Sequence, residues 1–273
     1  TKLVDRWLSN INKRQFTGVL FVDFAKAFDV INYNLLKKLA FYKISSNAMK
    51  LISSFLSDRQ QKVSSNTSMS HLLPNNYGVP QGSVLGPLLF SLYINDLPLS
   101  IETQCDMFAD DTTLEKSHSD VQQVYDTMQK NINHLVKWTH LNHMALHPQK
   151  TKFMLICTRQ KRQNLTQILP VLHIADVKVE EVTNHKVLGI TIDNNLSWSK
   201  HLEIMSKKIA SKLYQLRKIK NFLNSHARTL FFYSYIQSNI DYASTLWDLA
   251  SKNVMKPLLS IHKRAVKLTI NKS

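Results

Sequence analysis

The sequence predicts an α+β fold whose last part is wholly helical, and three patterns support this prediction. Val19–Val22 and Phe153–Cys157 are short apolar runs of the kind that form buried strands. Apolar residues recur at helical spacing from Val121 to Trp138, which predicts a long helix between those strands. From residue 200 onward the spacing is helical up to the C-terminus. Strands and helices therefore mix in the first part, and helices alone make up the second.

The remaining elements of the first part follow from residue type and spacing. Residues 1–15 are helical in tendency, and apolar stripes between 35 and 56 predict two further helices. Residues 57–77 are rich in Ser, Asn and Gln, which predicts turns around a short hairpin. Residues 85–93 are again apolar at helical spacing. The apolar residues on both sides of Asp110-Asp111 predict a strand, a tight turn and a second strand.

The last elements begin with a segment that has the composition of a strand. This segment is His185–Asp193, and Gly189 lies inside it. The helical part then begins at Lys200, and we expect breaks near Asn224 and Pro257 because these residues interrupt the periodic pattern.

The chain is strongly basic, and the charge is unevenly distributed. Lys and Arg total 35 against 19 Asp and Glu, for a net charge of +16. Residues 199–273 contain 14 Lys or Arg but only three acids. This shift predicts a boundary near 195, between a domain at 1–195 and a basic helical region at 196–273. The excess charge indicates a polyanionic partner, nucleic acid or an anionic membrane surface. No apolar run reaches the roughly 18 residues needed to cross a bilayer, so we expect no membrane-spanning segment.

Three carboxylates lie at positions where a negative charge is unfavourable without a cation nearby. Asp23 ends an apolar strand, and a buried charge is costly without a cation or partner nearby. Asp110 and Asp111 repel one another in a tight turn unless a cation lies between them. Oxygen ligands of this kind suit Mg²⁺. An interpretation without a metal also stays open. In it, Asp23 caps a helix that runs on from Phe24, and Asp110-Asp111 is a solvated turn.

Five segments resemble, in chain order, the motifs of a known family of enzymes. The family is that of the reverse transcriptases of non-LTR (LINE-like, jockey- and CR1-type) retrotransposons. Motifs A to E are, in order, similar to Phe21–Asp29, Gly78–Phe90, Phe108–Asp111 in the Phe-Ala-Asp-Asp form, His147–Lys152 and Val187–Asp193.

Two further segments extend the resemblance nearly to the C-terminus. Ile94–Pro98 prolongs motif B in the manner of jockey- and CR1-like elements, and Tyr242–Trp247 resembles the tail common to these elements. The five motifs cover about residues 19–195, and the long motif B string is the most specific of them.

The resemblance implies a two-metal site for nucleotidyl transfer. It makes Asp23 and Asp110 the main metal ligands, with Asp111 beside them and the backbone carbonyl of Phe24 as a further ligand. The cofactors would be two Mg²⁺ or Mn²⁺ ions. A pair of such ions can activate a 3′-hydroxyl and stabilise a leaving pyrophosphate.

The resemblance also implies contacts to the nucleotide. Phe28 would lie under the sugar of the incoming nucleotide and exclude a 2′-hydroxyl. The alternative is that Phe28 only packs in the core. Gln81 and Gly82 would touch the incoming nucleotide and the template, because Gly allows close backbone approach and Gln offers a donor and an acceptor. Lys150 would protonate the leaving pyrophosphate or neutralise its charge, with Lys152 as a competitor for this role.

The primer would meet two further parts of the chain. Leu188 and Gly189 would hold its end, as the primer grip. In the thumb-like region, one helix has an apolar face that would pack against the rest of the region. Its other face is basic, includes Lys208 and Lys212, and can contact phosphates. The apolar face consists of Leu202, Met205, Ile209, Leu213 and Leu216.

The fold and function implied by the resemblance are those of a polymerase. The palm would be an antiparallel sheet with helices on one face, followed by an all-helical thumb. The activity would be RNA-directed DNA polymerisation on an RNA template, with a DNA primer and deoxynucleoside triphosphates. Work in the nucleus would follow by analogy with target-primed reverse transcription.

The chain departs from the family at its start. Only 22 residues precede Asp23, so we expect the fingers to be largely missing and the remainder of the retrotransposon polyprotein, with fingers and endonuclease, to act beside it. Nucleotide affinity should then be poor and apolar surface exposed. An alternative therefore stays open, an inactive partial copy that only binds nucleic acid.

Overall fold

The structure is a computed structural model that describes residues 2–32, 34–166 and 168–270. Its internal contacts divide the chain into two compact units. One comprises residues 18–153 and 168–180, and the other residues 1–17, 154–167 and 181–273. The functional division into 1–195 and 196–273 stays a prediction.

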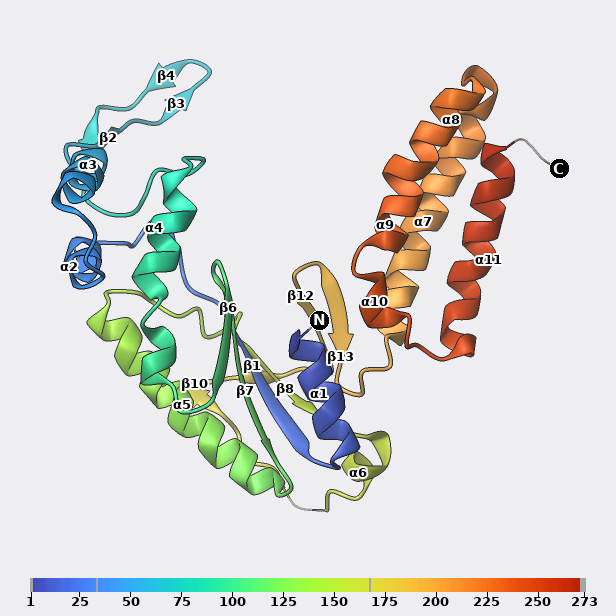
Figure 1. Cartoon of the computed structure of the whole chain (residues 1–273), viewed down its shortest axis with the longest axis horizontal. Helices are drawn as coiled ribbons and strands as arrows, with labels where there is room; N and C mark the ends of the chain where they lie inside the picture. Colours follow the sequence, from blue (N-terminus) through green and yellow to red (C-terminus); the bar gives the residue numbers. More distant parts are fainter. Residues whose placement is uncertain (1, 33, 167, 271–273) are drawn as a thin grey trace. The chain divides into compact units, whose positions relative to one another are not determined.

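A five-stranded sheet contains the strands that the apolar runs predicted (Figure 1). β1 occupies the centre of the sheet and is buried along its whole length, which explains why its sequence is apolar without alternation. β6 and β7 form an antiparallel hairpin that pairs Phe108 with Asp111, so the strand, turn and strand predicted around the acidic pair are confirmed. The order is β11 (Glu180–Glu181), β8 (Lys152–Ile156), β1 (Phe16–Val22), β7 (Asp111–His118) and β6 (Gln104–Phe108).

The predicted long helix is α5, Val121–Leu141, which packs against β7. Asp120 caps its start, because the Asp120 side chain accepts a hydrogen bond of 3.0 Å from the backbone N–H of Gln122. Gly18 of β1 lets the helix come close, since a Cβ there would lie 2.5 Å from Val124 Cγ1. The other helices of this unit are α2 (Asn34–Phe41), α3 (Ser46–Leu56), α4 (Leu85–Ile94) and the 3-10 turn η1 (Leu97–Ser100).

The polar segment after α3 forms the predicted hairpin, a ladder of two short strand pairs. β2 (Gln60–Gln61) pairs with β5 (Leu73–Pro74), and β3 (Ser64–Ser65) pairs with β4 (Ser68–Met69). A further small pair, β9 (His173–Ile174) with β10 (Val177–Lys178), lies beside α5.

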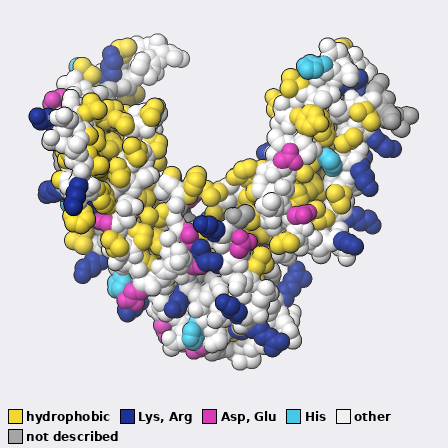
Figure 2. All heavy atoms as spheres, in the orientation of Figure 1, with side chains coloured by type: hydrophobic (Ala, Val, Ile, Leu, Met, Phe, Trp, Pro, Cys, Tyr) yellow, Lys and Arg dark blue, Asp and Glu magenta, His cyan; other side chains and the backbone are white. Residues whose placement is uncertain are grey.

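Apolar surface is exposed over α2, α3 and α4 (Figure 2). Val84 is 92% exposed, Phe41 84% and Leu88 55%. A soluble monomer rarely leaves so many large apolar side chains together in water, so this face has the character of a surface that packs against something.

In the other unit, the segment expected as one strand is a hairpin instead. β12 (Asn184–Val187) pairs antiparallel with β13 (Ile190–Asp193), and Leu188 and Gly189 form the turn between them. Both turn residues have positive φ, 46° and 83°, as a two-residue type I′ turn requires. The prediction of Gly189 inside a strand was therefore wrong, because the glycine supplies the turn conformation and not a strand position.

The helical region that begins near residue 200 is confirmed (Figure 1). α7 (Ser199–Ile219) packs against α11 (Lys252–Thr269) and buries all five predicted apolar residues. Asn224 caps α8 (Ser225–Phe232) through a 2.8 Å bond from the backbone N–H of Ala227, so the predicted break there is confirmed. The 3-10 turn η2 (Lys220–Phe222) lies between α7 and α8. Between α8 and α11 lie the π-helical η3 (Tyr233–Gln237) and the short helices α9 (Ser238–Asp241) and α10 (Ser244–Trp247).

The predicted break at Pro257 is wrong. Pro257 lies inside α11, in its second turn, where it removes a single hydrogen bond, that to the carbonyl of Asn253. Packing of the buried Leu258 and Ala265 keeps the helix continuous. This unit also contains α1 (Lys2–Asn12) and α6 (Arg159–Gln163). Across the described residues, no helix combines the length and apolarity needed to span a bilayer.

Candidate active site

Asp23 follows the last residue of β1, and the segment that resembles motif D holds its backbone on both sides. The N–H of His147 donates to the Asp23 carbonyl at 2.8 Å, and the Asp23 N–H donates to Thr151 Oγ1 at 3.2 Å. The N–H of Ala25 donates to the Ala145 carbonyl at 2.8 Å. Thr151 is fully buried. The motif A and motif D segments therefore form one backbone unit around Asp23.

Phe24 lies in the middle of this unit, as an isolated antiparallel bridge partner of Leu146. The bonds of the bridge are made by the neighbours on either side, so the pairing does not use the Phe24 carbonyl. The side chain of Phe24 is buried. Residues 25–29 form turns, so no helix runs on from Phe24 and the reading of Asp23 as a helix cap is wrong.

Asp110 and Asp111 occupy the tip of the β6–β7 hairpin. Ala109, the first residue of the two-residue turn, has φ 53°, a left-handed conformation that costs a non-glycine residue about 1–2 kcal/mol. Strain of this kind is often found at functional positions. Partial burial first, and then the neighbouring charges of Asp110 and Asp23, raise the pKa of Asp111 above its usual value.

The three carboxylates are therefore near enough to repel one another. Asp23 directly follows β1, Asp111 begins β7, and these two strands are neighbours in the sheet. In the part of the chain that the structure describes, none of the three carboxylates pairs with a Lys or Arg side chain. An all-oxygen donor set without a protein cation fits a hard divalent ion. Within the same described residues, however, no three His, Cys, Asp or Glu side chains are grouped closely enough to hold a common ion.

Phe28 is fixed by α4 and by the turn that resembles the start of motif B. Its ring packs on the buried ring of Phe90, with centroids 4.6 Å apart and planes inclined by 37°. Its carbonyl accepts the N–H of Val79 at 2.9 Å. Gly78 fits tightly here, because a Cβ on it would lie 2.8 Å from the backbone of Asp29. The side chain of Phe28 is only half-buried, so part of its surface is available to a ligand.

Gln81 and Gly82 lie exposed in the turn before α4. Gln81 Nε2 donates to Asp29 Oδ1 at 3.1 Å, which ties the turn to the motif A segment. Gly82 has φ 79°, and a Cβ on it would meet nothing within 4 Å. The glycine is therefore required by its backbone conformation, and the space beside it is open.

Arg59 supports the same turn and was missed from the sequence. Its guanidinium donates to the carbonyls of Tyr77 and Gly78, each at 2.7 Å. It lies in the polar hairpin segment, where nothing in the local pattern distinguishes it from a solvated arginine.

Lys150 and Lys152 differ in how they are engaged. Lys152 Nζ is 2.7 Å from Glu180 Oε2 and also donates to the Gln149 carbonyl. Lys150 is exposed, and its ammonium group has no partner among the described residues. Lys150 is therefore the lysine that is free to meet a ligand.

Leu188 and Gly189 belong to the other unit, where Tyr242 covers their turn. The Tyr242 hydroxyl donates to the Leu188 carbonyl at 2.6 Å, and a Cβ on Gly189 would lie 3.4 Å from its ring. Sequence reasoning assigned no role to Tyr242, although it begins a segment that resembles the family's tail.

The segments that resemble motifs A and C thus end side by side on neighbouring strands of one sheet in an α+β unit. The reverse transcriptase (RNA-dependent DNA polymerase) family profile matches residues 3–192 of this chain. The chain belongs to this family, whose members generally use divalent metal ions.

Two of the relatives are proteins of mobile elements of Drosophila melanogaster. The chain is 24% identical over 275 residues to the probable RNA-directed DNA polymerase from transposon X-element, and 22% identical over 277 residues to the RNA-directed DNA polymerase from mobile element jockey. These alignments cover 98% and 97% of this chain but 30% of each relative, so the chain spans about a third of their length. The resemblance to jockey-type non-LTR retrotransposons is thus confirmed.

Among solved structures, telomerase from Candida tropicalis in complex with a fragment of telomeric RNA gives a TM-score of 0.48 at 12% identity. The match covers 98% of this chain and 50% of the telomerase chain.

Proposed function

We propose that the chain is the catalytic part of an RNA-directed DNA polymerase, which transfers a nucleotide from a deoxynucleoside triphosphate to a primer 3′-hydroxyl. The observation that supports this most is the placement of Asp23 and Asp111, with Asp110 beside Asp111, at neighbouring ends of β1 and β7, where none of the three pairs with a Lys or Arg side chain among the described residues. The family match over residues 3–192 supplies the class of reaction.

In this proposal, the carboxylates of Asp23, Asp110 and Asp111 and the carbonyl of Phe24 would hold two Mg²⁺ or Mn²⁺ ions. Such ions supply the charge that activates the 3′-hydroxyl and stabilises the leaving pyrophosphate. The backbone bonds of Asp23 to His147 and Thr151 hold its side chain in place for this task. The protein contributes position and charge more than covalent chemistry.

The residues around the acids bind and select the nucleotide. The ring of Phe28, braced by Phe90, lies under the sugar and excludes a 2′-hydroxyl. Gln81 and Gly82 contact the incoming nucleotide and the template from the open side of their turn. Lys150, whose ammonium group has no partner in the described chain, neutralises or protonates the pyrophosphate.

The remaining parts of the proposal concern the primer and the partners. Leu188 and Gly189 hold the primer end, the palm lies within 1–195, and the basic helices of 196–273 form the thumb. The template is RNA and the primer DNA, and the rest of the retrotransposon polyprotein, with fingers and endonuclease, acts beside this chain. The work takes place in the nucleus, which imaging of a tagged chain in cells would test.

One observation favours a second candidate, a partial copy that binds nucleic acid without polymerising. Within the described residues, no three carboxylate, thiol or imidazole groups are arranged around a common ion position. The strong positive charge of the helical region needs no metal site to bind a polyanion.

Primer extension separates the two candidates. We expect the chain to extend an oligo(dT) primer on a poly(A) template with labelled dTTP and Mn²⁺, and Asp110→Asn to abolish extension, because it removes a charged ligand while keeping the shape of the side chain. The matched control is Asp176→Asn, which removes an exposed carboxylate in the turn between β9 and β10.

Equal extension by Asp110→Asn and the control would contradict the assignment of Asp110. Absence of extension by the unmodified chain, with primer-template binding intact in a gel shift, would favour the nucleic-acid-binding candidate.

A further inference from the structure

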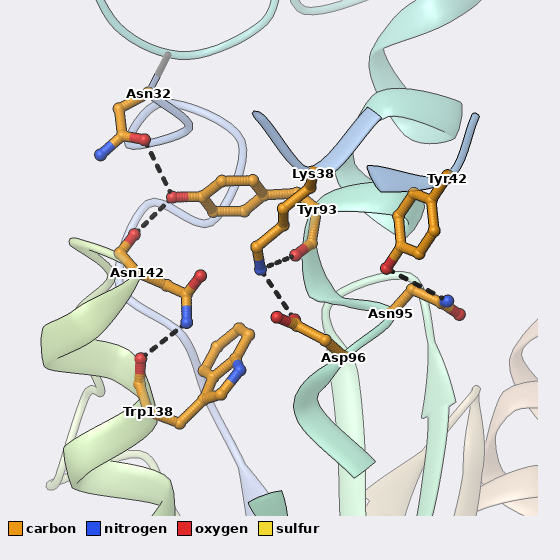
Figure 3. Close-up of polar contacts among 8 residues, drawn as sticks. All are labelled: Asn32, Lys38, Tyr42, Tyr93, Asn95, Asp96, Trp138 and Asn142. Atoms are coloured by element: carbon orange, nitrogen blue, oxygen red, sulfur yellow. Dashed lines mark hydrogen bonds and ion pairs between the residues drawn. The ribbon is translucent and has the colours of Figure 1, made fainter. Parts of the chain in front are cut away.

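The segment Ile94–Pro98, which prolongs motif B in the sequence, contains an acid that holds a half-buried lysine. Lys38 of α2 donates to Asp96 Oδ1 at 2.7 Å and to the Tyr93 carbonyl at 2.6 Å (Figure 3). Its ammonium group also lies 4.7 Å from the centre of the Tyr93 ring and 5.2 Å from that of Trp138. Burial lowers the pKa of Lys38 despite the attraction of Asp96. A cation is thus packed between α2, α4 and α5.

This lysine fixes Tyr93, whose hydroxyl reaches two segments that lead to the candidate active site. Tyr93 is fully buried, and burial raises its pKa to about 12. Its hydroxyl donates to the Asn142 carbonyl at the end of α5, and Asn32 Oδ1 lies 3.2 Å away as a second acceptor (Figure 3).

The chain that follows Asn142 is hydrogen-bonded to the segment that contains Asp23. Asn142 is buried, and its side-chain amide donates to the Trp138 carbonyl at 2.9 Å, so the end of α5 is fixed (Figure 3). Three residues later the chain reaches Ala145, whose carbonyl accepts the N–H of Ala25. His147 then donates to the Asp23 carbonyl. Only four residues therefore separate the Tyr93 anchor from the hydrogen bonds that hold the Asp23 backbone.

The residue next to Asn32 is hydrogen-bonded to the turn that contains Gln81 and Gly82. Asn32 directly follows Ile31, whose carbonyl accepts the N–H of Gly78 at 2.6 Å. Asn32 also caps the start of α2, since its side chain accepts the N–H of Asn34 at 2.9 Å. One hydroxyl thus touches both the loop that holds this turn and the loop that holds Asp23.

We infer that Tyr93, held by Lys38 and Asp96, is a positioning residue that keeps the Asp23 segment and the Gly78–Gly82 turn in register. Its catalytic consequence rests on the proposed function, whereas its effect on the two segments does not. Without the hydroxyl, the Asn142 carbonyl loses a buried donor, and the start of the loop from His143 to Thr151 loses its connection to α4. Misplacement of an active-site group by as little as about 1 Å can lower a rate about 100-fold.

Hydrogen exchange by mass spectrometry tests the inference on the full chain without any need for activity. We expect Tyr93→Phe to speed exchange at least about tenfold in peptides that cover Asp23–Ala25 and Ala145–Thr151, because the N–H groups of Ala25 and His147 report the pairing directly. The matched control is Tyr42→Phe, because the Tyr42 hydroxyl accepts a long 3.4 Å bond from the exposed Asn95 (Figure 3).

A second pair of variants keeps the test decisive if loss of the buried hydroxyl prevents folding. Lys38→Met should loosen the same peptides, and Lys38→Arg, which keeps the positive charge beside Asp96, should restore most of their protection. Unchanged exchange in Tyr93→Phe and Lys38→Met would overturn the inference. So would faster exchange spread evenly over the chain, since that would show a general loss of stability.

The catalytic consequence has its own readout. If the chain extends primers, Tyr93→Phe should lower kcat about 10- to 100-fold while primer-template affinity and the Tyr42→Phe control stay unchanged. Faster exchange in the two peptides with unchanged kcat would confine Tyr93 to a structural role and overturn the positioning inference, while leaving the polymerase proposal intact.

Discussion

The side chain of Phe28 packs against the protein on one side and remains accessible on the other. Its ring rests on the buried Phe90, its carbonyl is bound by Val79, and the side chain remains half-buried. A ring that is braced in this way can act as a wall, because it cannot move aside without breaking its contact with Phe90. The sequence could suggest the role only through the motif, since Phe28 lies in a turn where no periodic pattern distinguishes a wall from a core residue.

The sugar preference of Phe28→Val tests this role. We expect the ratio of dTTP to UTP incorporation on poly(A) to fall at least about tenfold, because valine leaves room for a 2′-hydroxyl. The lost ring contact should cost about 1 kcal/mol of stability, which thermal unfolding would measure. Phe41→Val is the matched control, because it removes a ring that is 84% exposed on α2. An unchanged ratio in Phe28→Val would remove the residue from the role of sugar gate.

At the scale of elements, periodicity located the helices and strands better than their ends and turns. β1, α5 and α7 lie where apolar spacing predicted them. A helix buried along one face has apolar residues at helical spacing, and a strand buried along its whole length is a continuous apolar run. The turn at Leu188-Gly189 and the continuation of α11 through Pro257 were not predicted. Both depend on tertiary contacts, from Tyr242 in one case and from the packing of Leu258 and Ala265 in the other.

The basic face of α7 gives the prediction that belongs to this scale. Lys208 is exposed and Lys212 is half-buried, with its ammonium group 5.4 Å from the centre of the Tyr235 ring. Lys200 and Lys207 instead form ion pairs with Glu203 at 3.1 and 2.5 Å. If the first two contact phosphates, the double variant Lys208→Ala/Lys212→Ala should lower the slope of log affinity against log salt by about 1.8 on duplex DNA.

The matched control for α7 is Lys200→Ala/Lys207→Ala, which removes the same charge from the same helix. Salt titrations of binding by fluorescence anisotropy would compare the two double variants. An equal fall in slope for both would show that only net charge matters and that α7 has no specific phosphate contacts.

At the scale of the whole molecule, the candidate site depends on pairings between segments distant in the sequence. Asp23 meets Thr151 across 128 positions, and Tyr93 meets Asn142 across 49. The motifs predicted which residues belong together, but not that Arg59, Tyr93 and Tyr242 hold them there. Such supporting residues are selected by the geometry of the fold, and the sequence around a tyrosine or an arginine does not indicate which residue it will contact.

Mn²⁺ binding followed by electron paramagnetic resonance tests most directly whether Asp23, Asp110 and Asp111 together bind a divalent cation. We expect the free Mn²⁺ signal to fall as the chain is added, with affinity at least about tenfold weaker in Asp110→Asn, a difference of about 1.4 kcal/mol, and unchanged in Asp176→Asn. Equal Mn²⁺ affinity in Asp110→Asn and the unmodified chain would contradict the account, because the carboxylates would then have no ion to hold.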